Sequence, residues 1–147
     1  MTDQPIDDDA MDLRGGITAF EGKHFGMAMQ LLTPLAEQGE PEAQYRVSIM
    51  CQNGLAGGPD PERAFKYMLA AAEQGHAMAQ HGLGFMYMEG ECVAQNAAEA
   101  VQWFEKAADQ GLMGSLATLA GMYMEGRGVE KDEERARALY RQAGFDI

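Results

Sequence analysis

The chain has 147 residues and carries 23 Asp and Glu against 11 Lys and Arg, a formal net charge of −12. Its length leaves room for one domain. The negative charge argues against nucleic acid as a partner, because phosphates need clustered Lys and Arg, and it favours a partner with a basic segment.

The apolar composition is unusual for a folded domain. Leu, Ile, Val and Phe together supply only 25 residues, and so low a share with a high net charge is typical of disordered chains. The apolar content is instead 23 Ala and 12 Met, which recur at helical spacing. We therefore predict an ordered, all-α fold in which small side chains let helices pack closely.

Residues 1–10 are predicted to form a disordered acidic tail. They contain no basic residue, and helical periodicity begins only at Met11. The tail either aids solubility or serves as a docking segment. Residues 1–13 also lack the basic start and apolar run of a signal peptide, and no stretch approaches the ~18 apolar residues of a membrane span. The sequence therefore predicts a cytoplasmic protein with no membrane contact.

Residues 11–40 are predicted to form a helix pair with a tight turn near 22–26. After the turn, Phe25, Ala28 and Leu32 follow helical spacing. His24 lies in the turn, and we interpret this lone exposed imidazole as a turn residue rather than a ligand or a base.

Residues 41–76 are predicted to contain helices near 42–53 and 61–74, separated by a glycine-rich loop. Asp60 is suited to cap the second helix, because Pro61 after it is well tolerated at the first helical position.

Residues 77–112 are predicted to repeat this arrangement. Asn96 is placed as an N-cap, and Glu99 has the spacing at which a carboxylate can reach back to the amide of the cap. Gly111 is suited to end that helix. Its buried side is predicted to consist of Ala100, Val101, Trp103, Phe104, Ala107 and Ala108.

Residues 113–147 are predicted to form the last helix pair. Its second helix, near 133–143, is rich in charged residues, as expected of a terminal unit that needs a polar outer face. Residues 144–147 are expected to fold over the last open edge.

Two strings recur with a period of 36 residues. Residues 36–39 and 72–75 both read Ala-Glu-Gln-Gly, and residues 108–111 read Ala-Asp-Gln-Gly. Residues 86–90 and 122–126 both read Met-Tyr-Met-Glu-Gly. This shared period indicates a repeat array, in which each unit buries its apolar face by stacking on its neighbours. The chain thus divides into units one to four, at about 11–40, 41–76, 77–112 and 113–147.

The two cysteines do not suggest a disulfide framework. Cys51 stands where units three and four have Tyr87 and Tyr123, so we predict a core residue. Cys92 falls in an interhelix loop where unit four has Gly128, a position open to exposure, and nothing in the sequence supports a redox role for it.

Unit three resembles a Sel-1-like repeat, a relative of the tetratricopeptide repeat. The residues that carry the resemblance are Ala79, Leu83, Gly84, Tyr87 and Gly90, followed by Ala100, Trp103, Lys106, Ala107, Ala108, Gln110 and Gly111. Units two and four keep much of this pattern, and the resemblance covers about residues 11–147. Unit one departs most, and its short turn resembles the tetratricopeptide form.

The resemblance implies a right-handed α–α superhelix of about four antiparallel helix pairs, a solenoid whose first helices line a concave face that binds proteins or peptides. Members of the family are adaptors in signalling, secretion, protein quality control and bacteria–host interaction. Secreted, cysteine-rich members have a disulfide in each repeat. This chain lacks those cysteines, which fits a cytoplasmic bacterial member.

No pattern typical of catalysis, cofactor binding or metal binding is present. The sequence contains no phosphate-binding glycine loop, nucleophile elbow or zinc-binding His-Glu-x-x-His motif. Ser48 and Ser115 fall at small packing positions, and His76 and His81 have the wrong spacing for two ligands on one helical face. We therefore predict no enzyme and no cofactor.

The first helix of unit three has two apolar stripes. Ala79, Leu83 and Met86 lie on the side expected to face the core, and a second stripe lies on the opposite side. A helix that is apolar on both sides must meet something on both. The second stripe and its equivalents in units two and four form the predicted partner-binding residues: Tyr45, Ile49, Met78, His81, Phe85, Met88, Glu89, Gly121, Met124 and Glu125.

In this hypothesis Tyr45, Phe85, Met88 and Met124 form apolar walls, and Gly121 leaves room for a side chain of the partner. The carboxylates of the stripe would attract positive charge. The alternative is that much of the stripe packs between adjacent first helices.

We thus predict a protein-interaction scaffold or adaptor. Two other functions stay open: a structural homo-oligomer built through Tyr140, Phe145 and Ile147 at the C-terminal edge, and an enzyme or small-ligand carrier. The sequence does not fix the oligomeric state.

Overall fold

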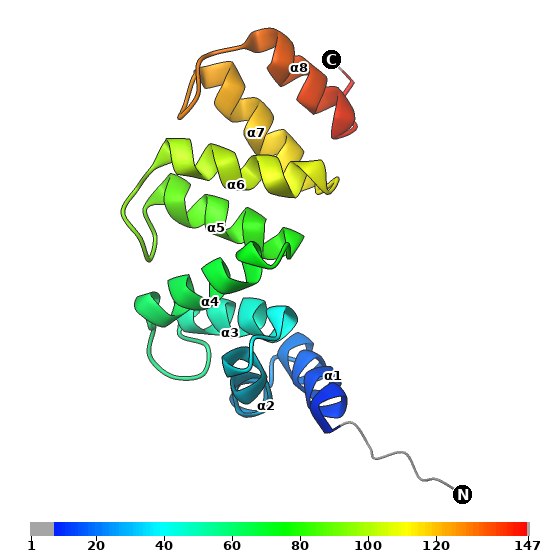
Figure 1. Ribbon diagram of the computed structural model, residues 1–147, viewed down its shortest axis with the longest axis vertical. Coiled ribbons are helices and arrows are strands. Elements are labelled where there is room, and N and C mark those ends of the chain that lie inside the picture. The colour runs from blue at the N-terminus through cyan, green and yellow to red at the C-terminus, as the bar shows by residue number, and fades with distance from the viewer. Residues whose placement is uncertain (1–7, 147) are drawn as a thin grey trace, which may run out of the picture.

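A computed structural model describes residues 8–146, and within that range the chain is helical with no strand. The prediction of an all-α solenoid is confirmed. The helices are α1 (Asp8–Glu21), α2 (Phe25–Glu37), α3 (Pro41–Asn53), α4 (Pro61–Glu73), α5 (Ala77–Glu89), α6 (Ala97–Asp109), α7 (Met113–Glu125) and α8 (Glu133–Gln142) (Figure 1).

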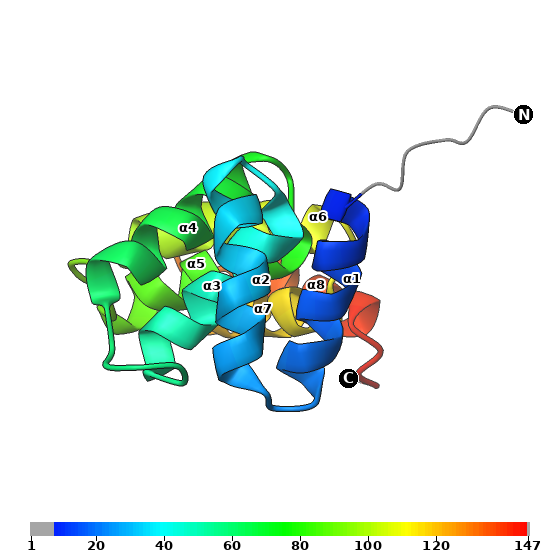
Figure 2. The same ribbon diagram turned by 90° about the horizontal axis from the view of Figure 1, so that it is seen from below.

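Consecutive helices pack in pairs, and each second helix also packs on the first helix of the next pair. The result is an elongated stack with α1 and α8 at opposite ends (Figure 1). The loops within pairs two to four lie along one side of the stack, and the short turns between these pairs lie along the other. Figure 2 views the stack from the α1 and α2 end. The handedness of the superhelix stays a prediction.

The period of 36 residues reappears as hydrogen bonds between units. Gln74 Nε2 donates to the carbonyl of Gly39 and to Oε1 of Gln44, each at 2.9 Å. Gln110 Nε2 makes the same two bonds one unit later, to Gly75 and to Gln80, again at 2.9 Å. The recurring glutamine therefore fastens α4 and α6 to the preceding turn and to the first helix of the same unit.

The predicted caps form at the second helices. The side chains of Asp60 and Asn96 accept hydrogen bonds from the backbone N–H groups three residues on, at 3.2 and 3.1 Å. Glu99 does not complete the expected reciprocal bond, because the N–H of Asn96 instead donates to the carbonyl of Tyr87 at 2.8 Å. That bond ties the loop to the end of the first helix.

Small side chains at the contacts between helices are fully buried. Ala71, Ala100, Ala107 and Ala136 each have 0% exposure. Cys51 is buried in the core, as predicted. Alanine at these positions lets helices approach closely, which explains how a chain poor in Leu and Ile still forms buried core clusters along the stack.

Helix α1 begins earlier than the sequence indicated. We expected the tail to extend to residue 10, but Asp8 and Asp9 form the first turn of α1. Carboxylates in a first turn interact favourably with the positive end of the helix dipole, so these residues are compatible with helix. Residues 1–7 of the predicted tail lie outside the described residues.

Over residues 8–146, no helix is both long enough and apolar enough to cross a bilayer.

Candidate partner-binding face

Helix α5 exposes apolar side chains on the side opposite its core stripe. Leu83 and Met86 are buried, whereas Met78 and Phe85 are 42% and 37% exposed. Glu89, one turn beyond Phe85, is also exposed. This part of the predicted stripe is therefore accessible.

Phe85 is held by other aromatic rings. Its ring meets Phe104 edge-on, with centroids 5.2 Å apart, and meets His81 in the same way at 4.9 Å. Phe104 is fully buried. The partly exposed ring of Phe85 is thus held in place by a buried ring of the core.

His81 lies at the junction between units three and four. Its Nδ1 is 2.7 Å from Oγ of the buried Ser115 in α7. Burial lowers the pKa of His81 below its ordinary value, because a desolvated imidazolium is disfavoured. His81 therefore contributes a neutral ring to the packing between units.

Met88 does not belong to an exposed surface, and its predicted role in partner binding is wrong. Its side chain is 7% exposed and packs in the core cluster of units three and four. The loop of unit four covers this end of α5, since Arg127 Nη2 donates to the carbonyl of Met88 at 3.0 Å. Met124, the equivalent residue in α7, is half-buried.

The unit-two residues of the stripe are half-buried between units. Tyr45 lies 4.9 Å from the ring of His76, and Ile49 packs against the core. Burial raises the pKa of the Tyr45 phenol, with a smaller opposite effect from Arg46. In unit two, much of this stripe is thus buried by packing between units. This agrees with the alternative interpretation, in which the stripe packs between adjacent helices and does not bind a partner.

The same part of unit two carries a charged network that the sequence did not reveal. His76 Nδ1 accepts from the N–H of Ala79 at 3.1 Å, and its Nε2 lies 2.8 Å from Glu42 Oε1. Glu42 also faces the guanidinium of Arg46, whose Nε lies 3.4 Å away. Because acceptance at Nδ1 leaves the proton on Nε2, His76 donates to Glu42 and links units two and three.

In unit four the equivalent stripe has smaller side chains, with Gly121 where unit three has Phe85. A Cβ placed on Gly121 would lie 3.6 Å from the hydroxyl of Tyr140, so the space above this glycine is bordered by α8. Glu125 is exposed. Room for a side chain of a partner at Gly121 stays a prediction.

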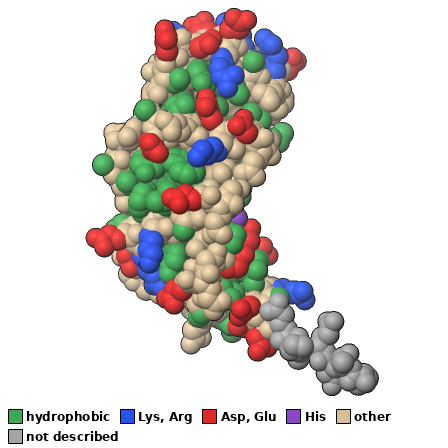
Figure 3. Space-filling model, viewed as in Figure 1, with side chains coloured by type: hydrophobic (Ala, Val, Ile, Leu, Met, Phe, Trp, Pro, Cys, Tyr) green, Lys and Arg blue, Asp and Glu red, His purple; other side chains and the backbone are tan. Residues whose placement is uncertain are grey.

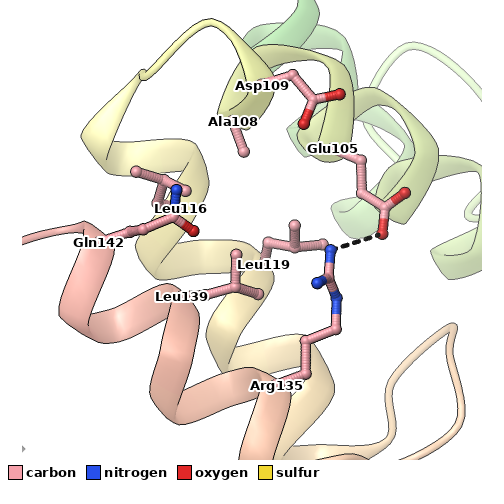
Figure 4. Close-up of a pocket in the computed structure, with 8 residues that line it drawn as sticks. All are labelled: Glu105, Ala108, Asp109, Leu116, Leu119, Arg135, Leu139 and Gln142. Carbon is pink, nitrogen blue, oxygen red and sulfur yellow. Dashed lines mark ion pairs between the residues drawn. The ribbon is translucent and has the colours of Figure 1, made fainter.

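A cavity of about 480 Å³ lies between α6, α7 and α8 and was not predicted (Figure 4). Tyr123 Oη donates to Glu105 Oε1 at 2.8 Å, and Arg135 Nη2 lies 4.0 Å from the same carboxylate. The cavity is lined by Glu105, Ala108, Asp109, Leu116, Leu119, Arg135, Leu139 and Gln142.

Among the described residues there is no group of three or more His, Cys, Asp or Glu side chains placed to hold a metal ion.

Figure 3 shows acidic side chains scattered over the viewed face and hydrophobic side chains gathered at mid-height, at the level of α5 and α6.

Comparison with protein families gives one match. The family described as Sel1 repeat matches at residues 41–76, 77–112 and 115–144. These ranges follow the predicted boundaries of units two and three and most of unit four. No curated protein sequence matches the chain.

Two solved structures are similar over nearly the whole chain. A Sel1 repeat protein from Oxalobacter formigenes is 33% identical, with a TM-score of 0.86 over 90% of this chain and 53% of its own. The protective antigen c5321 of uropathogenic Escherichia coli strains, which has an SLR fold, is 34% identical, with a TM-score of 0.87 over 92% of this chain and 30% of its own. The chain thus spans about half or less of these relatives.

The cysteine-rich protein B of Helicobacter pylori shares the fold. It is 22% identical, with a TM-score of 0.63 over 80% of this chain and 84% of its own.

Proposed function

Because the chain belongs to the Sel1 repeat family, generally a family of non-enzymatic interaction scaffolds, we propose that it binds a protein or peptide partner on a face lined by its first helices. The exposed residues of that face are Met78, Phe85 and Glu89 on α5 and Glu125 on α7. The half-buried residues Tyr45, Ile49, His81, Gly121 and Met124 form its floor and edges.

The observation that carries the proposal is the exposed ring of Phe85. A large aromatic side chain at 37% exposure, fixed from below by Phe104, loses little conformational freedom when a partner covers it. Aromatic anchors of this kind tend to dominate binding energy. Met78 lies on the same side of the helix, and its flexible thioether can adapt to different partner surfaces.

The charge on this face favours a basic partner segment. Glu89 and Glu125 occupy equivalent positions at the ends of α5 and α7, and both are exposed. They add to the chain's net charge of −12, which would speed encounter with a positively charged segment. The proposal involves no catalysis, cofactor, nucleic acid or membrane, and it places the protein in the cytoplasm.

Affinity capture from native lysate, followed by mass spectrometry, would identify the partner, and variants would locate the site. We expect Phe85→Ala to weaken binding of the captured partner by about tenfold or more, since an anchor is worth over about 1.4 kcal/mol. Glu89→Lys should also weaken binding of the partner, and the loss should be larger at low salt than at high salt. Both variants should keep the helical spectrum of the wild type.

Met27→Ala is the matched control, because Met27 is 58% exposed on α2 but lies outside the proposed face. It should bind as the wild type does. Unchanged binding by Phe85→Ala, or equal losses for Phe85→Ala and Met27→Ala, would refute the proposed face. Tyr45→Ala is less informative, because the contact with His76 makes it a packing variant as well.

One observation favours the structural alternative, a homo-oligomer formed through the C-terminal edge. Phe145 is 53% exposed although its ring meets Tyr140 edge-on, with centroids 5.5 Å apart. Its N–H donates to the carbonyl of Tyr140, so the segment turns back on α8. Ile147, the third residue of this hypothesis, lies outside the described residues. Light scattering over a range of concentrations, with Phe145→Ser for comparison, tests this alternative.

A further inference from the structure

The register of unit one within the repeat follows from a close contact between its two helices. A Cβ added to Gly16 would lie 2.4 Å from the side chain of Leu32. In unit three, a Cβ added to Gly84 would lie 2.7 Å from the ring of Phe104. Leu32 and Phe104 are two periods of 36 residues apart. Gly16 in α1 therefore corresponds to Gly84 in α5, which fixes the equivalent position of every other residue of α1.

One side of α1 is exposed, although the same side of the later first helices is buried against the preceding unit. Gln44 Nε2 donates to the carbonyl of Ala36 in the preceding second helix, at 3.1 Å. Gln80 Nε2 donates in the same way to the carbonyl of Ala72, at 3.2 Å. Both glutamines are 5% exposed. Asp12 stands at their position in α1 and is exposed, since no second helix precedes α1 in the described part of the chain.

A second cavity, of about 390 Å³, opens on this side of α1. Its lining includes Met11 of α1 and Met27 of α2, which are 59% and 58% exposed. Two large apolar side chains thus border a hollow at the first end of the stack. Arg14 also lines the cavity, and unit two has Arg46 at the same position. We call this surface the α1 edge and define it by Met11, Asp12, Gly15, Thr18 and Met27.

The opposite end of the stack has basic residues at the positions that face a following unit. Phe65 in α4 identifies this side of a second helix, because its ring meets Tyr87 of the next unit edge-on, with centroids 5.9 Å apart. Arg137 stands at the position of Phe65 in α8 and is exposed. One turn further, Arg141 stands where α6 has Glu105, and it is also exposed. The last second helix therefore presents two guanidinium groups on its outer side.

Two aromatic side chains accompany these arginines. Tyr140 is half-buried, and Phe145 is 53% exposed and packs on it. Arg137 Nη2 lies 3.8 Å from Glu133 of the same helix, an exposed ion pair that costs little to rearrange. We call this surface the α8 edge and define it by Arg137, Tyr140, Arg141 and Phe145. It shares Tyr140 and Phe145 with the C-terminal edge of the structural alternative.

We propose that the α8 edge of one copy of this chain docks on the α1 edge of a second copy and so continues the stack of repeats across two molecules. This inference rests on the structural alternative above and supplies the second surface that it needs. Charge complementarity supports it. Asp12 and Arg141 stand at the positions of Leu116 and Glu105, which line one cavity at the junction of units three and four. A joint with the same register therefore brings a carboxylate of one copy to a guanidinium of the other.

The two edges lie at opposite ends of the molecule, as Figure 1 shows for α1 and α8, so one chain cannot join its own edges. An interface between two different surfaces is heterologous, and it adds further copies until a ring closes or a filament forms. The joint involves the ends of the stack and not Met78 or Phe85. Its failure would therefore leave the proposed partner-binding face untouched.

Sedimentation velocity of the full chain over a range of concentrations tests the joint. We expect the average mass of the wild type to rise with concentration and to pass that of a dimer. Asp12→Arg and Arg141→Asp each bring like charges together, so each should weaken association by about tenfold or more. Glu62→Arg is the matched control, because Glu62 is exposed on α4, away from both edges, and it should associate as the wild type does.

The decisive variant carries both exchanges, Asp12→Arg and Arg141→Asp, and should regain association because the pair is restored with its charges reversed. A mixture of the two single variants should also associate, although each alone does not. Met11→Ser and Phe145→Ser remove apolar area from one edge each, and they serve as the second pair of variants if a charge variant loses its helical spectrum. Each of them should weaken association.

Three results would overturn the joint. The first is a wild type that stays monomeric at every concentration. The second is a loss of association with Arg141→Asp and Phe145→Ser but not with Asp12→Arg and Met11→Ser, which would leave the structural alternative standing as an interface between two α8 edges. The same result is expected if residues 1–7 of the same chain cover the α1 edge. The third is a folded double-exchange variant that does not regain association.

Discussion

The imidazole of His81 and the hydroxyl of Ser115 lie 2.7 Å apart, a hydrogen bond that joins the first helices of two adjacent units. The ring also meets Phe85 and Phe104 edge-on, at centroid distances of 4.9 and 5.5 Å. These contacts leave a protonated imidazole poorly solvated. Burial accordingly lowers the pKa of His81.

This lowered pKa predicts that the folded chain loses stability as the pH is lowered. In the unfolded chain the His81 side chain binds a proton with a pKa of about 6.5, whereas the folded state binds it only at lower pH. The unfolded state therefore holds more protons below about pH 6.5, and the free energy of unfolding decreases as the pH drops through this range, by at most about 1.4 kcal/mol per pH unit.

Urea unfolding between pH 7.5 and 5.5 measures the effect. His81→Asn should lose this part of the pH dependence, whereas His24→Asn, at an exposed turn position, should keep it. An unchanged slope in His81→Asn would mean that His81 is not responsible.

Overpacking a helix crossing should destabilise the fold. Ala107 is fully buried in α6, so Ala107→Leu forces the neighbouring helices apart at a cost of about 1–3 kcal/mol. Ala138→Leu in α8 is the matched control, because Ala138 is exposed. Thermal and urea unfolding should separate the two variants. Equal stability would place Ala107 away from a helix contact.

Both thiols should react slowly with alkylating reagents. Burial raises the pKa of Cys51 and of Cys92, and Glu91 raises the pKa of Cys92 further. A raised pKa leaves less thiolate at a given pH, and the thiolate is the nucleophile. The pH midpoint for alkylation of Cys92 should therefore lie above that of a free cysteine peptide measured alongside. Cys51, which is 4% exposed, should react more slowly than Cys92 until the chain is unfolded. A Cys92 midpoint at or below that of the peptide would contradict this.

Structural features that depend on residues close together in the chain could be predicted from the sequence. The caps at Asp60 and Asn96 depend on a few adjacent residues, and the period of 36 transfers each helix pair to the next unit. The core stripe of α5 followed from its spacing for the same reason.

Features that depend on two units at once were missed. Met88 lies on the outer side of α5 when that helix is considered alone, and it is buried because unit four contributes Arg127 and its loop. The cavity between α6, α7 and α8 was missed for the same reason, because its walls come from units three and four.

The loop of unit four approaches α6 so closely that one of its glycines should be essential. Gly128 has φ +72°, and a Cβ added there would lie 2.4 Å from the carbonyl carbon and oxygen of Ala97. Gly111 has a similar φ of +83°, but an added Cβ would meet nothing within 4 Å. The two positions therefore share the cost of a left-handed conformation and differ in the contact with backbone.

Gly111→Ala should cost about 1–2 kcal/mol of the free energy of unfolding, the price of a left-handed alanine. Gly128→Ala should cost about 1–3 kcal/mol more, because a backbone contact can be relieved only by moving the loop or the start of α6. Cys92 adopts the same conformation in unit three, with φ +65°, so a side chain at this position of the repeat is not excluded in general. Urea unfolding of the two variants measures the difference, and equal losses would show that the approach to Ala97 imposes no constraint.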